Sequence, residues 1–141
     1  MFETVIIATD GSKSGERAVE TAVDLAAKFD ATVHALYVLD ESRIDSLPDR
    51  LHDEVHGALE EQATEALEAV ADRVDGETVT AVRTGDPARQ IARYAEEVDA
   101  DVVATGTRGR DGEHSFLLGS VAESVVRTCP VPVLTVRQLE A

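Results

Sequence analysis

The chain has 141 residues, 28 of them acidic and 13 basic, so its formal net charge is −15. This length suffices for one domain, residues 1–141, with its own hydrophobic core. The negative charge argues against binding to nucleic acids or to anionic membranes, because both partners are themselves anionic. The single cysteine, Cys129, excludes an internal disulfide framework and a cysteine-based zinc site, and we interpret it as structural.

Only two of the basic residues are lysines, Lys13 and Lys28. Acidic excess with few lysines resembles proteins of salt-loving (halophilic) organisms, in which salt screens the repulsion between like charges. The opening residues lack the basic region of a signal peptide. No stretch approaches the roughly 18 apolar residues of a membrane span. We therefore expect a cytoplasmic protein.

The first half of the chain alternates between two kinds of apolar pattern. Residues 3–9 form a short, nearly continuous apolar run, which is typical of a strand buried on both faces. Apolar residues at helical spacing follow over 10–30, and a second strand is predicted over 31–39. A polar connection over 40–49 leads to a long amphipathic helix over about 50–74.

The second half continues the alternation. A third strand is predicted over 77–84, and Asp86 and Pro87 are a typical N-cap and first residue of a helix that runs to about residue 98. A fourth strand follows over 101–106. The fourth helix is predicted to begin at Val121, and a fifth strand over 131–137.

Strands that alternate with helices favour parallel pairing, with right-handed crossovers and helices on both faces of one sheet. We therefore expect a single doubly wound, Rossmann-like α/β domain with a five-stranded parallel sheet in the order 3-2-1-4-5. In such folds ligands bind beyond the carboxyl ends of the strands. Two ends have suitable residues: Thr9 and Asp10 after the first strand, and Gly106 onward after the fourth.

The loop after the fourth strand has the chemistry of a phosphate site. Glycines at Gly106, Gly109 and Gly119 allow backbone amides to approach an anion, and Arg108 can neutralise charge. Ser120 comes just before the predicted helix, whose N-terminus favours anions, and can cap that helix or bind phosphate. The spacing matches neither GxxxxGK[ST] nor GxGxxG. Glycine turns and a serine helix cap remain an alternative explanation of the same residues.

The spacing of these glycines and the serine is a more specific signal than the residue types alone. The pattern G-x2-G-x9-G-[ST] resembles the ATP-binding branch of the universal stress protein family. Further similar segments cover nearly the whole chain: TVIIATDGSKSGERAVETAVDLA, HALYVLD, TGDPARQIARYAEEVDADVVATGTRGR and LLGSVAESVVRTCPVPVLTVR.

The resemblance implies a role for residues at the ends of the first two strands. Asp10, next to Thr9, would contact the adenosine ribose or a metal ion bound to the phosphates. Val38 would give backbone contacts to adenine. The implied cofactor is ATP, with AMP or cyclic AMP as alternatives, accompanied by Mg²⁺ or Mn²⁺.

The resemblance also implies that six residues line the ribose and the phosphates: Gly106, Arg108, Gly109, Gly119, Ser120 and Val121. The last three would hold phosphate through backbone amides and the serine hydroxyl. Asp111 and Glu113 depart from the family pattern, because they put negative charge into the loop. They either face water, help to hold a cation or weaken binding.

Three functions follow as hypotheses. The first is an ATP-binding universal stress protein that acts as a nucleotide-dependent stress-response or signalling module. The second is a slow ATPase, acting alone or with a partner. Asp10, Asp111 and His114 are the only candidates near the γ-phosphate, although none is an obvious general base. The third is a dimeric interaction module with weak or no nucleotide binding.

Two further features bear on partners and metals. Pro132 indicates that the last strand lies at a sheet edge, and pairing of residues 131–137 with a second copy would cover that edge; a homodimer is also implied by the resemblance. His52 and His56 have the spacing of a helical metal pair. They lack the glutamate of HExxH and a third ligand, so we interpret them as a solvated helix side.

Overall fold

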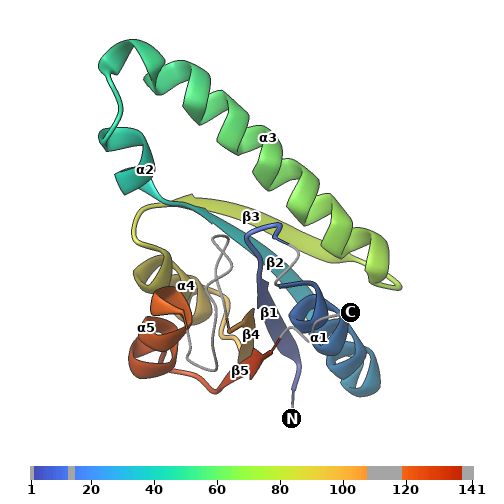
Figure 1. Cartoon of the computed structure of the whole chain (residues 1–141). Coiled ribbons are helices and arrows are strands. Elements are labelled where there is room, and N and C mark those ends of the chain that lie inside the picture. Colours follow the sequence, from blue (N-terminus) through green and yellow to red (C-terminus); the bar gives the residue numbers. More distant parts are fainter. Residues whose placement is uncertain (1, 13–14, 108–118, 138–141) are drawn as a thin grey trace.

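The computed structural model describes residues 2–12, 15–107 and 119–137. Within them, five strands form one parallel sheet in the order β3-β2-β1-β4-β5, which confirms the predicted topology (Figure 1). The strands are β1 (Thr4–Ala8), β2 (Thr32–Leu39), β3 (Thr78–Thr84), β4 (Val102–Gly106) and β5 (Val133–Val136). The helices are α1 (Glu16–Phe29), α2 (Glu41–Asp45), α3 (Asp49–Arg73), α4 (Pro87–Glu97) and α5 (Ser120–Thr128).

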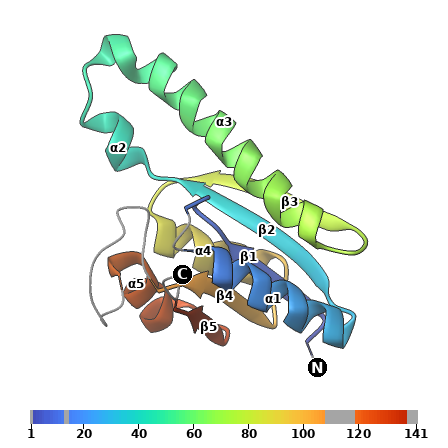
Figure 2. The ribbon, with the colours of Figure 1, turned by 45° about the vertical axis from the view of Figure 1, so that its right-hand side comes forward.

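Two helical layers bury the central strands, with α1 and α3 on one face and α4 and α5 on the other (Figures 1 and 2). Successive side chains of a strand point to opposite faces. Accordingly, Val5 and Ile7 of β1 pack in the α1–α3 core, whereas Ile6 packs in the α4–α5 core. All three are fully buried, which explains why β1 reads as a continuous apolar run.

Helix α3 is longer than the sheet beneath it. Its 25 residues span about 37 Å at the rise of an α-helix, whereas the eight residues of β2 span about 26 Å. The apolar face predicted from residue 51 onward is therefore buried only between Ala63 and Val70, while Leu51 and Val55 are half-buried. In the described part of the chain, no helix combines the length and the apolar character of a membrane span.

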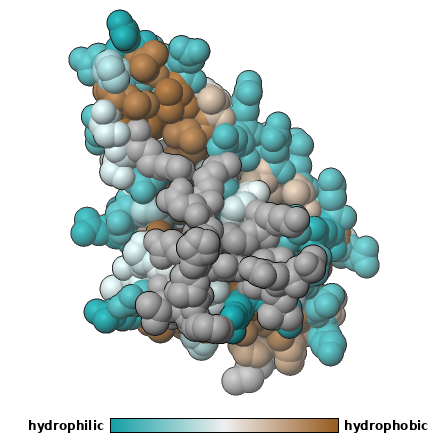
Figure 3. Space-filling view, viewed as in Figure 1, coloured by the Kyte–Doolittle hydropathy of each residue, from teal (hydrophilic) through white to brown (hydrophobic). Residues whose placement is uncertain are grey.

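The prediction of a simple polar connection over residues 40–49 was wrong, because this segment contains helix α2. Asp40 is its N-cap, and its Oδ1 accepts hydrogen bonds from the Ser42 amide at 3.0 Å and the Ser42 hydroxyl at 2.7 Å. Ile44 of α2 is buried. Figure 3 shows hydrophobic residues gathered at this projecting end, where α2 meets the start of α3. Burial of Ile44 against that apolar surface stabilises α2.

The last strand begins later than predicted. Pro132 precedes β5 instead of lying within it, and its carbonyl accepts a hydrogen bond from the Val103 amide at 2.9 Å. A proline has no amide hydrogen to donate, but it can still accept at the start of an edge strand. Strand β5 does lie at an edge of the sheet, as predicted.

Asp101 fastens the start of β1 to the start of β4. Its Oδ2 accepts hydrogen bonds from the backbone amides of Glu3 at 2.8 Å and Thr4 at 2.9 Å. These bonds, that of Glu3 first, stabilise the charged carboxylate and hold the pKa of Asp101 below its ordinary value of 3.8. The carboxylate therefore stabilises the fold at every pH above that value.

We expect Asp101→Asn to lower the free energy of unfolding at neutral pH, because an amide oxygen is a weaker acceptor than a carboxylate. A group with a depressed pKa loses its contribution as the pH falls through its folded value. The deficit of the variant should therefore persist from neutral pH down to about pH 4 and shrink as the pH falls below 3.8, as measured by urea denaturation. Asp72→Asn removes the same charge from an exposed position of α3 and is the control. A deficit that does not depend on pH would contradict the assignment.

Candidate functional site

The carboxyl ends of β1, β2 and β4 bring several of the predicted site residues to one edge of the sheet. Pairing of β1 with β2 continues past the strand, since the Thr9 amide donates to the Leu36 carbonyl at 3.0 Å. Extended by two residues beyond the pair of Ala8 and Leu36, this register brings Asp10 level with Val38. On the other side of β1, strand β4 ends at Gly106. The parallel sheet therefore places the predicted ribose, adenine and phosphate contacts along the same edge.

The loop after β1 is held by its own side chains. Asp10 Oδ1 accepts a hydrogen bond from the Ser12 amide at 2.8 Å, and Thr9 Oγ1 accepts one from the Gly11 amide at 3.1 Å. Asp10 does not cap the first helix, although it comes shortly before it: the N-cap of α1 is Gly15, which makes no side-chain cap. Within the described residues, the hydrogen bond to Asp10 uses its Oδ1.

The start of α5 lies next to the end of β4. The Gly119 amide donates to the Thr107 carbonyl at 2.6 Å, which joins the two glycine-containing ends of the predicted phosphate loop. Gly119 is the N-cap, so the helix begins at Ser120, one residue earlier than predicted, and the expected side-chain cap from Ser120 is not formed. Because Gly119 already donates its amide, the first turn presents its other unpaired amides to an anion, among them those of Ser120 and Val121.

The N-terminus of α5 also carries an acidic residue, whose negative charge is partly neutralised by an arginine. Glu123 lies in the first turn of α5, where a carboxylate competes with any bound anion. Its Oε1 is 2.8 Å from the Arg127 guanidinium, one turn further along the helix. This pairing directs the Glu123 carboxylate along α5, and the exposed Val121 adds no charge of its own.

Several predicted loop residues lie outside the described part of the chain. They are Arg108 and Gly109, which were expected to line the ribose and phosphates, and Asp111, Glu113 and His114. The predictions for these five residues stay predictions.

The carboxylate of Asp10 suits a metal ion that is also bound by the phosphates of a ligand, more than a metal ion bound by protein side chains alone. Among the residues that the structure describes, no group of three or more His, Cys, Asp or Glu side chains could hold a metal ion. Mg²⁺ is commonly bound by one or two carboxylates together with substrate phosphates and water. Asp10 is suited to provide such a carboxylate.

The two histidines of α3 have separate structural partners. Nε2 of His52 is 2.7 Å from the Leu47 carbonyl, and Nδ1 of His56 is 3.0 Å from Oε1 of Glu60. His52 thus ties the start of α3 to the preceding turn, while His56 forms an i, i+4 pair. Both histidine side chains are partly exposed, in keeping with our interpretation of the pair as a solvated helix side.

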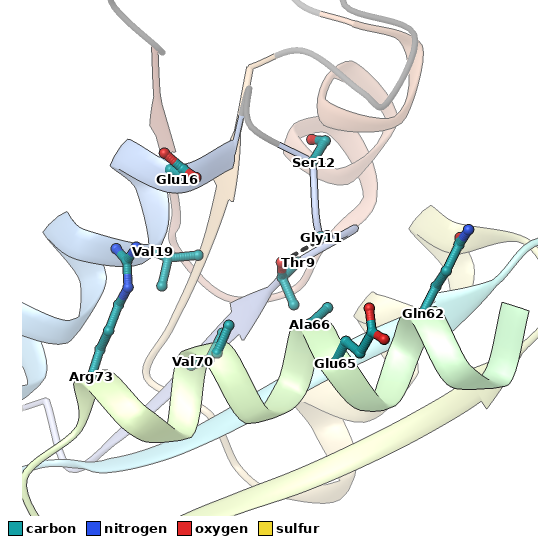
Figure 4. Close-up of a pocket in the computed structure, with 11 residues that line it drawn as sticks. Thr9, Gly11, Ser12, Glu16, Val19, Gln62, Glu65, Ala66, Val70 and Arg73 are labelled. Carbon is teal, nitrogen blue, oxygen red and sulfur yellow. Dashed lines mark hydrogen bonds between the residues drawn. The ribbon is translucent and has the colours of Figure 1, made fainter.

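Sequence reasoning missed a cavity of about 210 Å³ between α1 and α3 (Figure 4). Its walls are the loop after β1, the first turns of α1 and one face of α3. The lining residues are Thr9, Gly11, Ser12, Glu16, Val19, Gln62, Glu65, Ala66, Ala69, Val70 and Arg73. The spacing of the α3 members, 62, 65, 66, 69, 70 and 73, follows one helix face, and that period is the signal from which they could have been found.

Comparison with known proteins agrees with the fold and with the resemblance seen in the sequence. Residues 1–137 match the model described as "Universal stress protein family". A universal stress protein of Methanocaldococcus jannaschii is 36% identical over 142 residues, covering 98% of this chain and 84% of that protein. Among solved structures, a universal stress protein in complex with cAMP has a TM-score of 0.71 at 26% identity, covering 96% of this chain and 97% of that one.

A second solved structure is the universal stress protein from Archaeoglobus fulgidus in complex with dAMP. Its TM-score is 0.66 at 25% identity, with 96% of this chain and 98% of that chain covered. The family model thus spans nearly the whole chain, and each of the two structural alignments covers 96% of it. The chain belongs to the universal stress protein family.

Proposed function

We propose that this protein is a stress-response or signalling module that binds an adenine nucleotide at the carboxyl edge of its sheet. The observation that carries the proposal is the convergence of Asp10, Val38, Gly106 and the first amides of α5 at that edge. The cAMP and dAMP complexes of two structural neighbours support an adenine nucleotide as the ligand.

Each part of the nucleotide has a matching group in this proposal. The backbone of Val38 contacts adenine, and Oδ2 of Asp10 accepts from the ribose hydroxyls or binds a phosphate-bound Mg²⁺ or Mn²⁺. The amides of Ser120 and Val121 donate to phosphate oxygens, with the Ser120 hydroxyl beside them. Such a site recognises phosphate by backbone donors, so ATP, AMP and cyclic AMP all remain candidate ligands, with ATP as our proposal.

Binding, and not hydrolysis, is the activity that we propose. In the described part of the edge, the only carboxylate of the proposed site is Asp10, and its Oδ1 already accepts the Ser12 amide. A carboxylate committed to its own loop and to ribose is poorly placed to activate water as well.

We further propose a homodimer formed through β5. Within the described residues, this strand pairs with another strand on one side only, and an unpaired strand edge favours pairing with another strand. A two-fold operation would pair β5 with the same strand of a second copy. Analytical ultracentrifugation tests this: a dimer is expected, and a protein that stays monomeric at the concentrations used for binding would contradict it.

The proposed ligand is tested by purifying the protein in high salt and identifying bound nucleotide by mass spectrometry and chromatography. The expected result is adenine nucleotide in the purified protein, or saturable binding when ATP and Mg²⁺ are added. ATP should remain intact during incubation. Steady release of phosphate that Asp10→Ala abolishes would establish an ATPase instead, and the absence of any binding at about 1 mM ATP would contradict the proposal.

A further inference from the structure

The cavity between α1 and α3 has an apolar floor and a polar rim (Figure 4). Val19 of α1 and Val70 of α3 form the floor and are buried. Glu65 and Gln62 rise from α3 toward the loop that carries Gly11 (Figure 4). A volume of about 210 Å³ corresponds to roughly seven water molecules in the liquid. The cavity therefore has room for a compact organic molecule with a short apolar body.

The charges around the rim are predominantly negative. Glu16 and Glu65 both line the cavity, and among the described residues neither carboxylate has an ion-pair partner. Among the described lining residues, the cation is Arg73, which is paired at 3.1 Å with Glu20 on α1. A bound anion would face two uncompensated carboxylates and an arginine that is already neutralised. A cation would gain charge-assisted hydrogen bonds instead.

The loop after β1 adds neutral acceptors and a fixed wall. Gly11 has φ +76°, and a Cβ at this position would lie 3.1 Å from Cβ of Ala66 on α3. The loop and α3 are thus in close contact at this point, which closes the end of the cavity. The hydroxyl of Thr9, bonded to the Gly11 amide, faces the same space. An ammonium group has three donors and can therefore use both carboxylate and hydroxyl oxygens.

We propose that this cavity is a second ligand site, specific for a small organic cation such as an alkylammonium or a short diamine. The carboxylate of Glu65, assisted by Glu16, binds the ammonium group, and the floor between Val19 and Val70 takes the methylene chain. The site shares Thr9 of the loop after β1 with the proposed nucleotide site, whereas Asp10 and Val38 do not line it. Its occupation does not require that nucleotide be bound.

The test uses the full-length chain without nucleotide and the four-carbon diamine putrescine as the probe. Backbone amide signals are followed by NMR as putrescine is added at constant salt. Saturable shifts are expected at Val19, Glu65, Ala66, Ala69 and Val70. Butanediol, the neutral molecule of the same length, should cause no such shifts.

Three variants distinguish binding in this cavity from nonspecific attraction of putrescine to an acidic protein. Glu65→Gln removes a carboxylate of the rim and should weaken putrescine binding roughly tenfold, as expected for the loss of a charge-assisted hydrogen bond. Glu68→Gln removes the same charge from an exposed position of α3 that does not line the cavity, and should leave the affinity unchanged. Ala69→Leu should abolish binding by filling the space while leaving both carboxylates in place.

Three results would overturn the proposal: equal losses in Glu65→Gln and Glu68→Gln, equal binding of butanediol, or no saturable shift at the cavity amides up to about 10 mM putrescine. None of these outcomes depends on ATP. The proposal for the cavity and the proposal for the nucleotide site can therefore be confirmed or contradicted independently.

Discussion

Asp10→Ala is expected to weaken ATP binding by roughly 10- to 100-fold, the loss typical of a hydrogen bond to a charged group. We propose Oδ2 of Asp10 as an acceptor at the carboxyl edge of the sheet, level with Val38, where we place the ribose. The substitution removes this acceptor and also the carboxylate that would share a phosphate-bound metal ion. Isothermal titration calorimetry with ATP and Mg²⁺ measures the change.

Two further variants show whether the loss arises from the ligand contact or from the loop. Asp10→Asn retains an oxygen that accepts from the Ser12 amide, so the loop should stay folded while the charge is lost. It should therefore bind ATP more weakly than the wild-type protein. Asp24→Ala removes an exposed carboxylate of α1 and should change the affinity little. Unchanged affinity in Asp10→Ala, or an equal change in Asp24→Ala, would exclude a direct contact.

Gly11→Ala should cause the largest loss of stability among the glycine substitutions compared here. Its φ of +76° is in the left-handed region, which costs an alanine about 1–2 kcal/mol. The new methyl group would also lie 3.1 Å from Cβ of Ala66, tighter than ordinary contact, so loop and helix must move apart. We expect the free energy of unfolding to fall by about 2 kcal/mol or more, measured by urea denaturation.

Two other glycines provide matched controls for the two causes. Gly76 has φ +115° but nothing within 4 Å of an added Cβ, so Gly76→Ala should show the backbone strain alone. Gly57 lies exposed in α3 with open space around it, and Gly57→Ala should raise the stability by about 1 kcal/mol through helix propensity. If Gly11→Ala and Gly76→Ala cost the same, the contact with Ala66 contributes nothing.

The parallel sheet and the position of the site edge could be predicted because both follow from local patterns. Val5, Ile6 and Ile7 are apolar on both faces of a strand, which indicates a parallel sheet, and Thr9 and Asp10 follow at the carboxyl end. The detail of that turn could not be predicted. An aspartate that accepts from the amide two residues on suits both an Asx turn and a helix N-cap, and only the folded loop separates them.

The length of the regular elements was harder to predict than their order. The apolar spacing from Leu51 to Val70 indicates one helix, but not that its first turns lie past the sheet and are covered by α2. The cavity was missed for a related reason. Glu16 and Glu65 are far apart in the sequence, and only the side-by-side packing of α1 and α3 brings them to one rim.

Amide shift mapping with ATP and Mg²⁺ tests most directly the central claim, that the carboxyl edge of the sheet binds adenine nucleotide. Saturable shifts should concentrate at Asp10, Val38, Gly106, Ser120 and Val121. The cavity residues of α3, such as Ala69, should shift little. Shifts confined to the cavity, or no saturable shift at the five edge residues, would contradict the claim.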